Sequence, residues 1–172
     1  MNLLILGAGE YGQLVKELAR NMFVIIDFLD DNSPSAVGKL KDYKSLKDKY
    51  KNAIVAIGNN QVRSEWIEKL EKSGYNLPII ISDRAHISLT ATIGPGCIVE
   101  PMAIIQSNVK VGKGSIISSG AVVNHNAIVH NCCHIDCNAV VGADAIVPEK
   151  MNLSYGQVIT RATKIKNMEF NE

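Results

Sequence analysis

Three histidines and three cysteines crowd one short stretch of the chain and are its most obvious candidates for chemistry. They lie between residues 125 and 137: His125, His130, Cys132, Cys133, His134 and Cys137. An imidazole exchanges protons near neutral pH, and imidazoles together with thiolates can bind zinc. The stretch therefore predicts either proton transfer or a metal site. The two can be distinguished by whether the backbone brings these side chains together.

A six-residue repeat governs that backbone. An aliphatic residue recurs at every sixth position from Ile87 to Ile165, and the residue four positions later is mostly small, as at Ala121 and Cys133. A short fixed repeat indicates stacked identical units. Six residues on each of three flat sides predict a triangular coil of about eighteen residues, with the aliphatic anchors in the core and the small residues at the corners.

The phase of the cysteines in this repeat argues against zinc. Cys133 takes a small inward position, where cysteine behaves as a small apolar residue. Cys132 and Cys137 fall at other phases, so their sulfur atoms would diverge instead of forming a tetrahedron. We therefore expect no metal and reduced thiols, with a structural zinc site as the rejected alternative.

Two of the histidines have positions that suit contact with a ligand. His125 lies two residues past the anchor Val123, outside the predicted core and on a side that a neighbouring subunit could cover. His134 replaces an aliphatic residue just before the anchor Ile135. A solvated loop histidine and a structural histidine are the respective alternatives, and His130 is assigned to the surface.

The N-terminal half carries a second signal, loops that follow short apolar strands. Residues 3–6 form such a strand, and Gly7-Ala8-Gly9-Glu10-Tyr11-Gly12 then leads into a helical pattern. Glycines in this context admit a ligand to the backbone, and a helix N-terminus attracts an anion. Further apolar strands at 23–26 and 53–57 also end in polar loops. These loops predict a nucleotide site formed by Gly9, Glu10, Tyr11, Asp30, Asp31, Gly58, Asn59 and Asn60.

Three strand–helix units of this kind predict half a Rossmann sheet, which is enough to bind a mononucleotide. The apolar stretch 78–81 is expected to be its last strand. The alternative is that the glycines only pack strand against helix. We expect two domains, an α/β Rossmann-like half-sheet over residues 1–82 and an all-β coil over residues 83–172.

With both halves described, the chain resembles the hexapeptide-repeat acetyltransferases, in the branch of sialic-acid O-acetyltransferases and UDP-amino-sugar N-acetyltransferases. The resemblance rests on Gly7-Ala8-Gly9, Phe28-Leu29-Asp30-Asp31, Ala56-Ile57-Gly58-Asn59-Asn60 and Val123-Asn124-His125-Asn126. It implies that the coil is a left-handed parallel β-helix, a handedness that general rules of topology would not predict. It also implies transfer of an acetyl group from acetyl-coenzyme A to an amino or hydroxyl group of a nucleotide-linked sugar in surface glycan assembly.

The resemblance also assigns roles to particular residues. His125 is implied to be the general base, with Asn126 beside it, and His134, Gly142 and Ala143 are implied to contact acetyl-coenzyme A. Neighbouring prisms of a homotrimer are implied to form the active-site cleft. The weakly charged, aliphatic segment 87–150 independently favours self-association.

The chain departs from the family pattern in three places. An acidic residue usually follows the catalytic histidine and stabilises its imidazolium, whereas this chain has Asn126. Tyr11 replaces a histidine that is frequent in the glycine loop, and the repeat frays near its end, where Met151, Gln157 and Thr163 occupy small positions. The alternative function is therefore a catalytically weakened or inactive homologue that binds a nucleotide sugar.

The bulk properties exclude several other classes of protein. The net charge is +1 and no basic block is present, which argues against nucleic acid as a partner. No apolar run reaches membrane-spanning length, and the first residues lack the layout of a signal peptide. We expect a cytoplasmic enzyme with no membrane partner.

Overall fold

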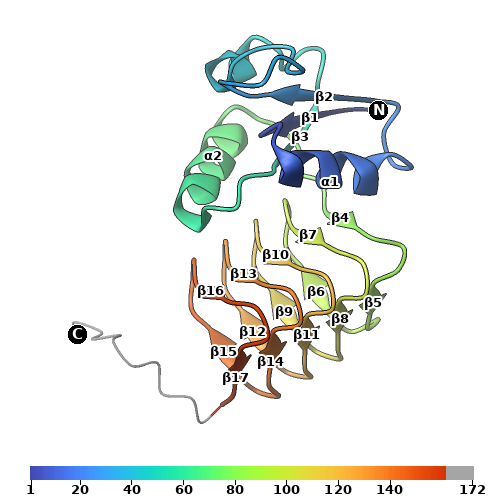
Figure 1. Cartoon of the computed structure of the whole chain (residues 1–172), viewed down its shortest axis with the longest axis vertical. Coiled ribbons are helices and arrows are strands. Elements are labelled where there is room, and N and C mark those ends of the chain that lie inside the picture. The colour runs from blue at the N-terminus through green and yellow to red at the C-terminus, as the bar shows by residue number, and fades with distance from the viewer. Residues whose placement is uncertain (162–172) are drawn as a thin grey trace, which may run out of the picture.

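The computed structural model describes residues 1–161, and its N-terminal part is a parallel sheet with the strand order β2-β1-β3 (Figure 1). Its elements are β1 (Asn2–Leu6), α1 (Glu10–Ala19), β2 (Ile25–Leu29), the 3-10 helix η1 (Leu40–Lys44), β3 (Asn52–Val55) and α2 (Asn60–Lys72). Leu3 and Ile5 enter one core and Leu4 and Leu6 another, because successive side chains of the central strand point to opposite faces of the sheet. The predicted Rossmann-like half-sheet is confirmed.

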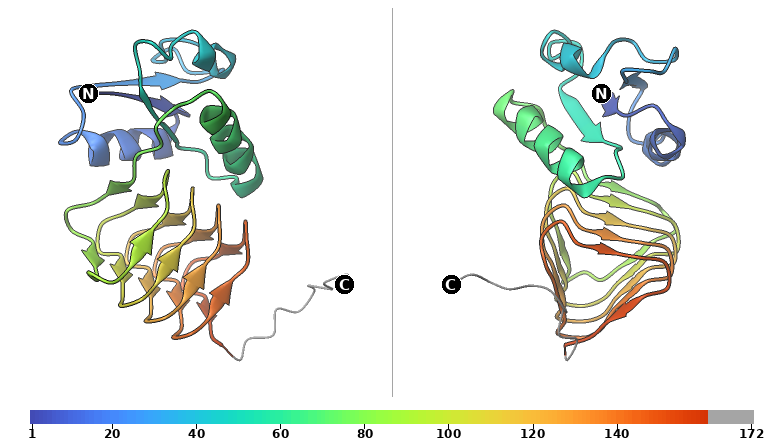
Figure 2. Two further views of the ribbon diagram at one scale, coloured as in Figure 1. Left: turned by 180° about the vertical axis from the view of Figure 1, so that it is seen from behind. Right: turned by 60° about the vertical axis from the view of Figure 1, so that its left-hand side comes forward.

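The following residues wind into a triangular prism with three parallel sheets, which we name faces I, II and III (Figure 2). Face I contains β4 (Ile80–Ile81), β7 (Ile98–Val99), β10 (Ile116–Ile117), β13 (His134–Ile135) and β16 (Asn152–Leu153). Face II contains β5 (His86–Ile87), β8 (Ile104–Ile105), β11 (Val122–Val123), β14 (Val140–Val141) and β17 (Val158–Ile159). Face III contains β6 (Thr92–Ile93), β9 (Lys110–Val111), β12 (Ile128–Val129) and β15 (Ile146–Val147).

The six-residue repeat explains the core of this prism. Val99, Ile117 and Ile135 are aligned on adjacent strands, so each coil takes eighteen residues. The anchors from Val99 to Ile159 are buried in one cluster, together with the small residues at the corners. The predicted left-handed parallel β-helix is confirmed, and the anchor Ile165 and the small position Thr163 lie outside the described residues.

Each corner from residue 96 to residue 156 also contains one residue in the left-handed backbone conformation. These residues recur every six positions, as Gly96, Gly114, Gly120 and Gly156 and, with φ between 54° and 64°, as Met102, Asn108, Asn126, Cys132, Asn138, Asp144 and Lys150. Glycine and asparagine adopt this conformation at the lowest cost. The repeat predicts that the small residue makes the turn, but the left-handed conformation is adopted by the residue before it. Asn126 therefore suits the left-handed backbone at its corner, and it also places an amide instead of a carboxylate beside His125.

The prism begins six residues before Ile87, the first anchor of the predicted repeat. Ile80 and Ile81 pair with Ile98 and Val99 of face I, and not with the N-terminal sheet as expected for a last strand at 78–81. Ile81 lies six residues before the first anchor and packs against the prism core. The domain boundary after residue 82 stays a prediction.

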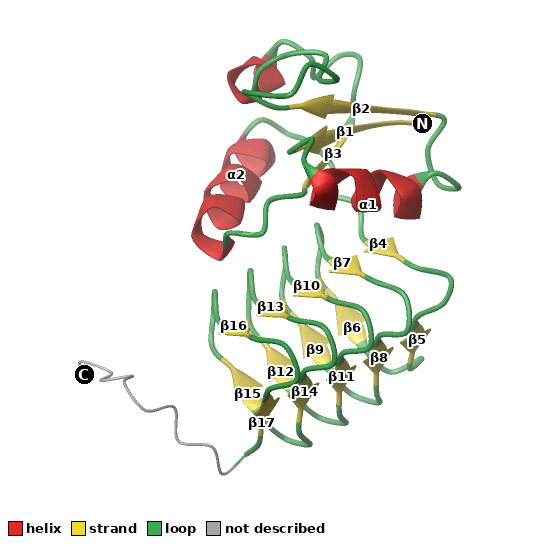
Figure 3. Ribbon diagram, viewed as in Figure 1, coloured by secondary structure: helices red, strands yellow, loops and turns green. Residues whose placement is uncertain are grey.

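Helix α1 lies between the parallel sheet and face I (Figure 3). Val15 and Ala19 of this helix share a buried cluster with Ile80, Ile98 and Ile116, which are the outward residues of the first three strands of face I. The two domains thus have a continuous apolar contact, which fixes the loops of the sheet above face I.

A buried arginine makes the polar part of the same contact. Arg63 of α2 is fully buried, and its guanidinium donates to the carbonyl oxygens of Gly114 at 2.7 Å, Cys132 at 2.9 Å and Cys133 at 3.1 Å. It also donates to the carbonyl of Gly58 at 3.0 Å, in the loop that follows β3. One side chain therefore ties a predicted nucleotide loop to two coils of the prism.

Candidate active site

The glycine loop after β1 divides into packing glycines and an open glycine. Gly7 has φ of 105°, and a Cβ atom on Gly12 would lie 2.1 Å from the Gly7 carbonyl oxygen, so both glycines are needed for close strand–helix packing. Gly9 has no atom within 4 Å of its Cβ position. It is the N-cap of α1, and no side chain caps that helix. The structure therefore supports the packing alternative for Gly7 and Gly12 and leaves the backbone at Gly9 open.

Asp30 holds the next loop against the glycine loop. Its Oδ2 accepts from the Ala8 amide at 2.8 Å, and its Oδ1 accepts from the amides of Asn32 at 2.8 Å and Ser33 at 2.9 Å. These bonds, with the one from Ala8 largest, lower the pKa of the Asp30 carboxyl. Asp31 similarly accepts from the Leu40 amide at 3.0 Å. Both carboxylates therefore already organise the loops.

The loop after β3 follows the same plan. The Asn59 side chain caps α2 by accepting from the Val62 amide at 3.0 Å, and Asn60 donates to the Lys150 carbonyl of the prism at 3.0 Å. Gly58 has no atom within 4 Å of its Cβ position. Gly9 and Gly58 thus present open backbone at the carboxyl edge of adjacent strands, where ligands bind in α/β sheets.

His134 projects outward from face I where the cover of α1 ends. On the strands before it, the equivalent positions Ile98 and Ile116 are fully buried, whereas His134 is half-buried and Asn152 on the next strand is exposed. Its Nε2 lies 3.0 Å from the Ser118 hydroxyl. Burial is the main cause that lowers the pKa of His134, which keeps the ring neutral.

An acidic residue that the sequence pattern did not indicate, Glu100, belongs to this group. Glu100 is buried on the coil before Ser118 and accepts from the Ser118 hydroxyl at 3.3 Å and from the amide and hydroxyl of Ser119, each at 3.0 Å. Burial and then the charge of the nearby Glu100 carboxylate raise the pKa of Tyr11. A charged residue in a charge-poor repeat, eighteen positions before a serine on the same face, was the available signal.

His125 lies at the corner between faces II and III. Its Nδ1 is 3.2 Å from Asn126 Nδ2, and Asn126 Oδ1 is 3.2 Å from Asn108 Nδ2. The His125 amide donates to Gln106 Oε1 at 3.1 Å. This corner is opposite face I in the triangular section, so one chain does not bring His125 to the loops of the N-terminal sheet (Figure 2).

The residues assigned to coenzyme A are also divided. Ala143 is eighteen residues after His125 and stacks one coil above it, and the next residue, Asp144, donates its amide to the His125 carbonyl at 3.1 Å. Gly142 belongs to the same corner, whereas His134 is on face I. A ligand that touches His134 as well as Gly142 and Ala143 would therefore have to lie between two prisms.

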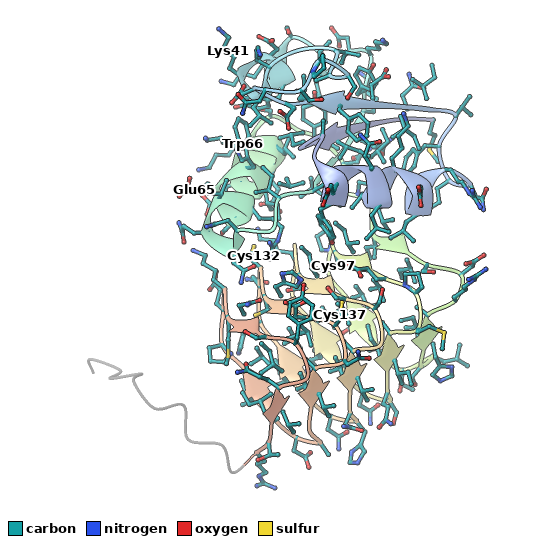
Figure 4. All side chains as sticks on the ribbon, in the orientation of Figure 1. Lys41, Glu65, Trp66, Cys97, Cys132 and Cys137 are labelled. Carbon is teal, nitrogen blue, oxygen red and sulfur yellow. The ribbon has the colours of Figure 1, made fainter. Side chains whose placement is uncertain are left out.

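The cysteines have structural surroundings. Cys97, Cys132 and Cys137 lie at separate places along the prism in Figure 4. Burial raises the pKa of Cys97 to about 12 and that of Cys133 to about 11. In the described part of the chain, no three His, Cys, Asp or Glu residues are arranged to hold a metal ion. Nor is any helix between residues 1 and 161 long and apolar enough to cross a bilayer.

Two protein families match separate parts of the chain. Residues 2–70 match the PglD N-terminal domain, and residues 90–125 match the bacterial transferase hexapeptide repeat, which consists of six repeats. The first match includes the glycine loops of the N-terminal sheet, and the second covers part of the prism and ends at His125.

Solved structures with the same two-part architecture are similar to this chain. The acetyltransferase domain of PglB from Neisseria gonorrhoeae, in complex with acetyl-coenzyme A, is 27% identical over 92% of this chain and 87% of that chain, with a TM-score of 0.77. A variant of perosamine N-acetyltransferase from Caulobacter crescentus, in complex with CoA and GDP-perosamine, is 23% identical over 93% of this chain and 80% of that chain, with a TM-score of 0.89. WeeI from Acinetobacter baumannii is 21% identical over 94% and 90%, with a TM-score of 0.73.

Proposed function

We propose that this chain, which belongs to the hexapeptide-repeat sugar acetyltransferases, transfers the acetyl group of acetyl-coenzyme A to an amino group of a nucleotide-linked sugar in glycan biosynthesis. The observation that carries the proposal is the open backbone of Gly9 and Gly58 beside face I, with a neutral histidine, His134, at the edge of that face. The similar Caulobacter and Neisseria proteins bind a nucleotide sugar or acetyl-coenzyme A. We place the reaction in the cytoplasm.

The nucleotide would bind at the glycine loops. The uncapped N-terminus of α1 offers free amides and a positive dipole to the phosphates, next to Gly9, Glu10 and Tyr11. Asp30, Asp31, Asn59 and Asn60 take part mainly by fixing the loops, because most of their polar atoms already have partners. Gly58 would then admit the ligand to the backbone between these loops.

We further propose a homotrimer in which two chains share each active site. The outward aliphatic residues of face II support it: Ile104, Val122, Val140 and Val158 form a ladder, and Val158 is 59% exposed in one chain. An apolar ladder of this kind favours a protein contact. The trimer would bring the corner with His125, Gly142 and Ala143 of one chain to face I of the next.

His125 would act as the general base. The amine nitrogen attacks the thioester carbonyl carbon, the carbon–sulfur bond breaks, and the amine proton passes to His125 while coenzyme A leaves as its thiolate. The thiolate then takes up a proton. Asn126 orients the ring but cannot balance the imidazolium charge as a carboxylate would.

The second candidate function is a catalytically weakened protein that binds a nucleotide sugar. The pair of Asn126 and Asn108 favours it, because an amide can donate to or accept from the imidazole and so does not select the tautomer that a base requires.

Mass spectrometry of the products tests the proposal. The protein is incubated with acetyl-coenzyme A and a panel of UDP-, GDP- and CMP-linked amino sugars, with the matching hydroxyl sugars as controls. We expect one amino sugar to become acetylated and to raise the melting temperature. Acetylation of hydroxyl sugars alone would contradict N-transfer. Stabilisation without any acetylation would establish the binding protein instead.

A further inference from the structure

Glu100 is a buried carboxylate that has no cationic partner in the described chain. Its side chain is 5% exposed, and no lysine, arginine or histidine within residues 1–161 forms an ion pair with it. Three donors from Ser118 and Ser119 satisfy its oxygens. Because burial of an unpaired carboxylate is costly, its presence in the apolar prism calls for a reason other than stability.

The hydrogen bonds around Ser118 define the protonation of His134. A carboxylate can only accept, so the single hydroxyl proton of Ser118 points to Glu100 Oε1. The Ser118 oxygen must then accept from its other neighbour, which is His134 Nε2 at 3.0 Å. The neutral imidazole therefore carries its proton on Nε2 and has a lone pair on Nδ1.

We propose that Glu100, acting through Ser118, is a positioning residue that fixes His134 as the Nε2–H tautomer, so that Nδ1 accepts a hydrogen bond from an N–H group of a substrate. This inference rests on the proposed function, since it names the chemistry by which face I meets a substrate. The N–H group belongs either to the amide arm of acetyl-coenzyme A or to the amine of the sugar.

The surroundings of His134 suit this task. No hydrogen bond to Nδ1 is formed in the part of the chain that the structure describes, and the ring is half-buried at the edge of the domain contact. Arg63, which donates to the carbonyl of Cys133 just before His134, holds the backbone of the strand. The carboxylate of Asp136, two residues after His134, is held in place because it accepts from the Cys137 amide at 2.8 Å. The acceptor at Nδ1 is therefore held on a rigid support.

Nitrogen NMR of the histidine side chains tests the tautomer directly. The chain has four histidines, so comparison with His134→Gln identifies the signal of His134. We expect the Nε2–H form in the native protein and in Ser118→Thr, which keeps the hydroxyl, and a mixture of tautomers in Ser118→Ala. Ser119→Ala is the matched control, because it removes a donor to Glu100 but leaves the link to His134 intact. An Nδ1–H form in the native protein, or the same tautomer in all four proteins, would overturn the inference.

Steady-state kinetics identifies the substrate that Nδ1 meets. In Ser118→Ala we expect the KM of one substrate to rise by roughly tenfold with a smaller change in kcat, and Ser118→Thr should restore it. A rise for acetyl-coenzyme A assigns the N–H group to its amide arm, and a rise for the sugar assigns it to the amine. An unchanged KM for both substrates would refute the contact. If no sugar is acetylated at all, calorimetric binding of acetyl-coenzyme A and the NMR result still test the inference, so the two failures can be told apart.

Discussion

His125 and His134 differ in the groups that surround the imidazole ring, the first at a corner of the prism and the second on face I. His125 is exposed and its ring contacts an amide, which is held in turn by another amide. His134 is half-buried, and its ring contacts a hydroxyl that is held by a carboxylate. The amide groups beside His125 can rotate by 180° and so fit either tautomer of its ring. The carboxylate behind Ser118 can only accept, and it therefore fits one tautomer of His134. The backbone contributes to the difference, because position 126 requires a left-handed residue and favours asparagine.

The largest expected effect separates His125 from the other histidines. We expect His125→Ala to reduce turnover by about 10²–10⁴-fold and to leave the melting temperature unchanged, because the side chain is the proposed general base and is exposed. His130→Ala is the matched control at another exposed histidine and should retain full turnover. Equal turnover in His125→Ala and the native enzyme would rule out the proposed base.

The next effect concerns the support behind face I. Arg63→Met should lower the free energy of unfolding by about 3 kcal/mol, because three buried carbonyl groups, two partly buried carbonyl groups and the Asn60 side chain lose their donor. Lys113→Met removes the exposed interdomain ion pair with Glu71 and should cost at most about 1 kcal/mol. Urea unfolding measures both variants. Similar losses in the two would show that the buried arginine is not the main polar tie between the domains.

Much of the architecture could be predicted because it follows from spacing. The six-residue period fixes the core and the corners of the prism, and the glycine loops after apolar strands fix the half-sheet. The left-handed position before each small residue was missed, although glycine or asparagine fills most of those positions. This position is constrained by its backbone angle φ, and the spacing of hydrophobic residues carries no information about φ.

The candidate site was less accessible to prediction for a different reason. Asp30, Asn59 and Asn60 stand where ligand-binding residues are expected, but their side chains are used by neighbouring backbone groups and by Arg63. Glu100 meets Ser118 only when two coils stack, so its role depends on a register that a single pass along the chain does not reveal.

A smaller effect tests whether the amide at position 126 limits His125. Asn126→Asp should raise turnover by roughly tenfold, because a carboxylate accepts from Nδ1–H, leaves Nε2 free as a base and stabilises the imidazolium. Aspartate is chosen over glutamate because it tolerates the left-handed conformation better. Asn138→Asp has the same backbone conformation on another corner and should leave the rate unchanged. A rate for Asn126→Asp at or below that of the native enzyme would show that the amide is not limiting.

The smallest expected effect is a pH dependence of the protein's stability that is caused by His134 on face I. Burial holds the pKa of His134 below its usual value near 6.5, so below that pH the unfolded chain binds a proton that the folded chain does not. His134 therefore contributes stability above pH 6.5 that is lost as the pH falls toward its folded pKa. The melting temperature should drop over this range by less in His134→Gln than in the native protein. The same drop in both would exclude His134 as the cause, and His130→Gln is the control.

The proposed sharing of one active site between two chains is tested most directly by mixed trimers. His125→Ala removes the base, and Gly58→Phe fills the open loop without backbone strain, since Gly58 has a free Cβ position and no positive φ. Each variant alone should be nearly inactive. When the two are co-expressed in equal amounts, one site in four combines a native corner with a native loop from the next chain, and about a quarter of the native turnover should return. If each site lies within a single chain, the mixed trimers will be as inactive as the parents, and this result would contradict a shared active site.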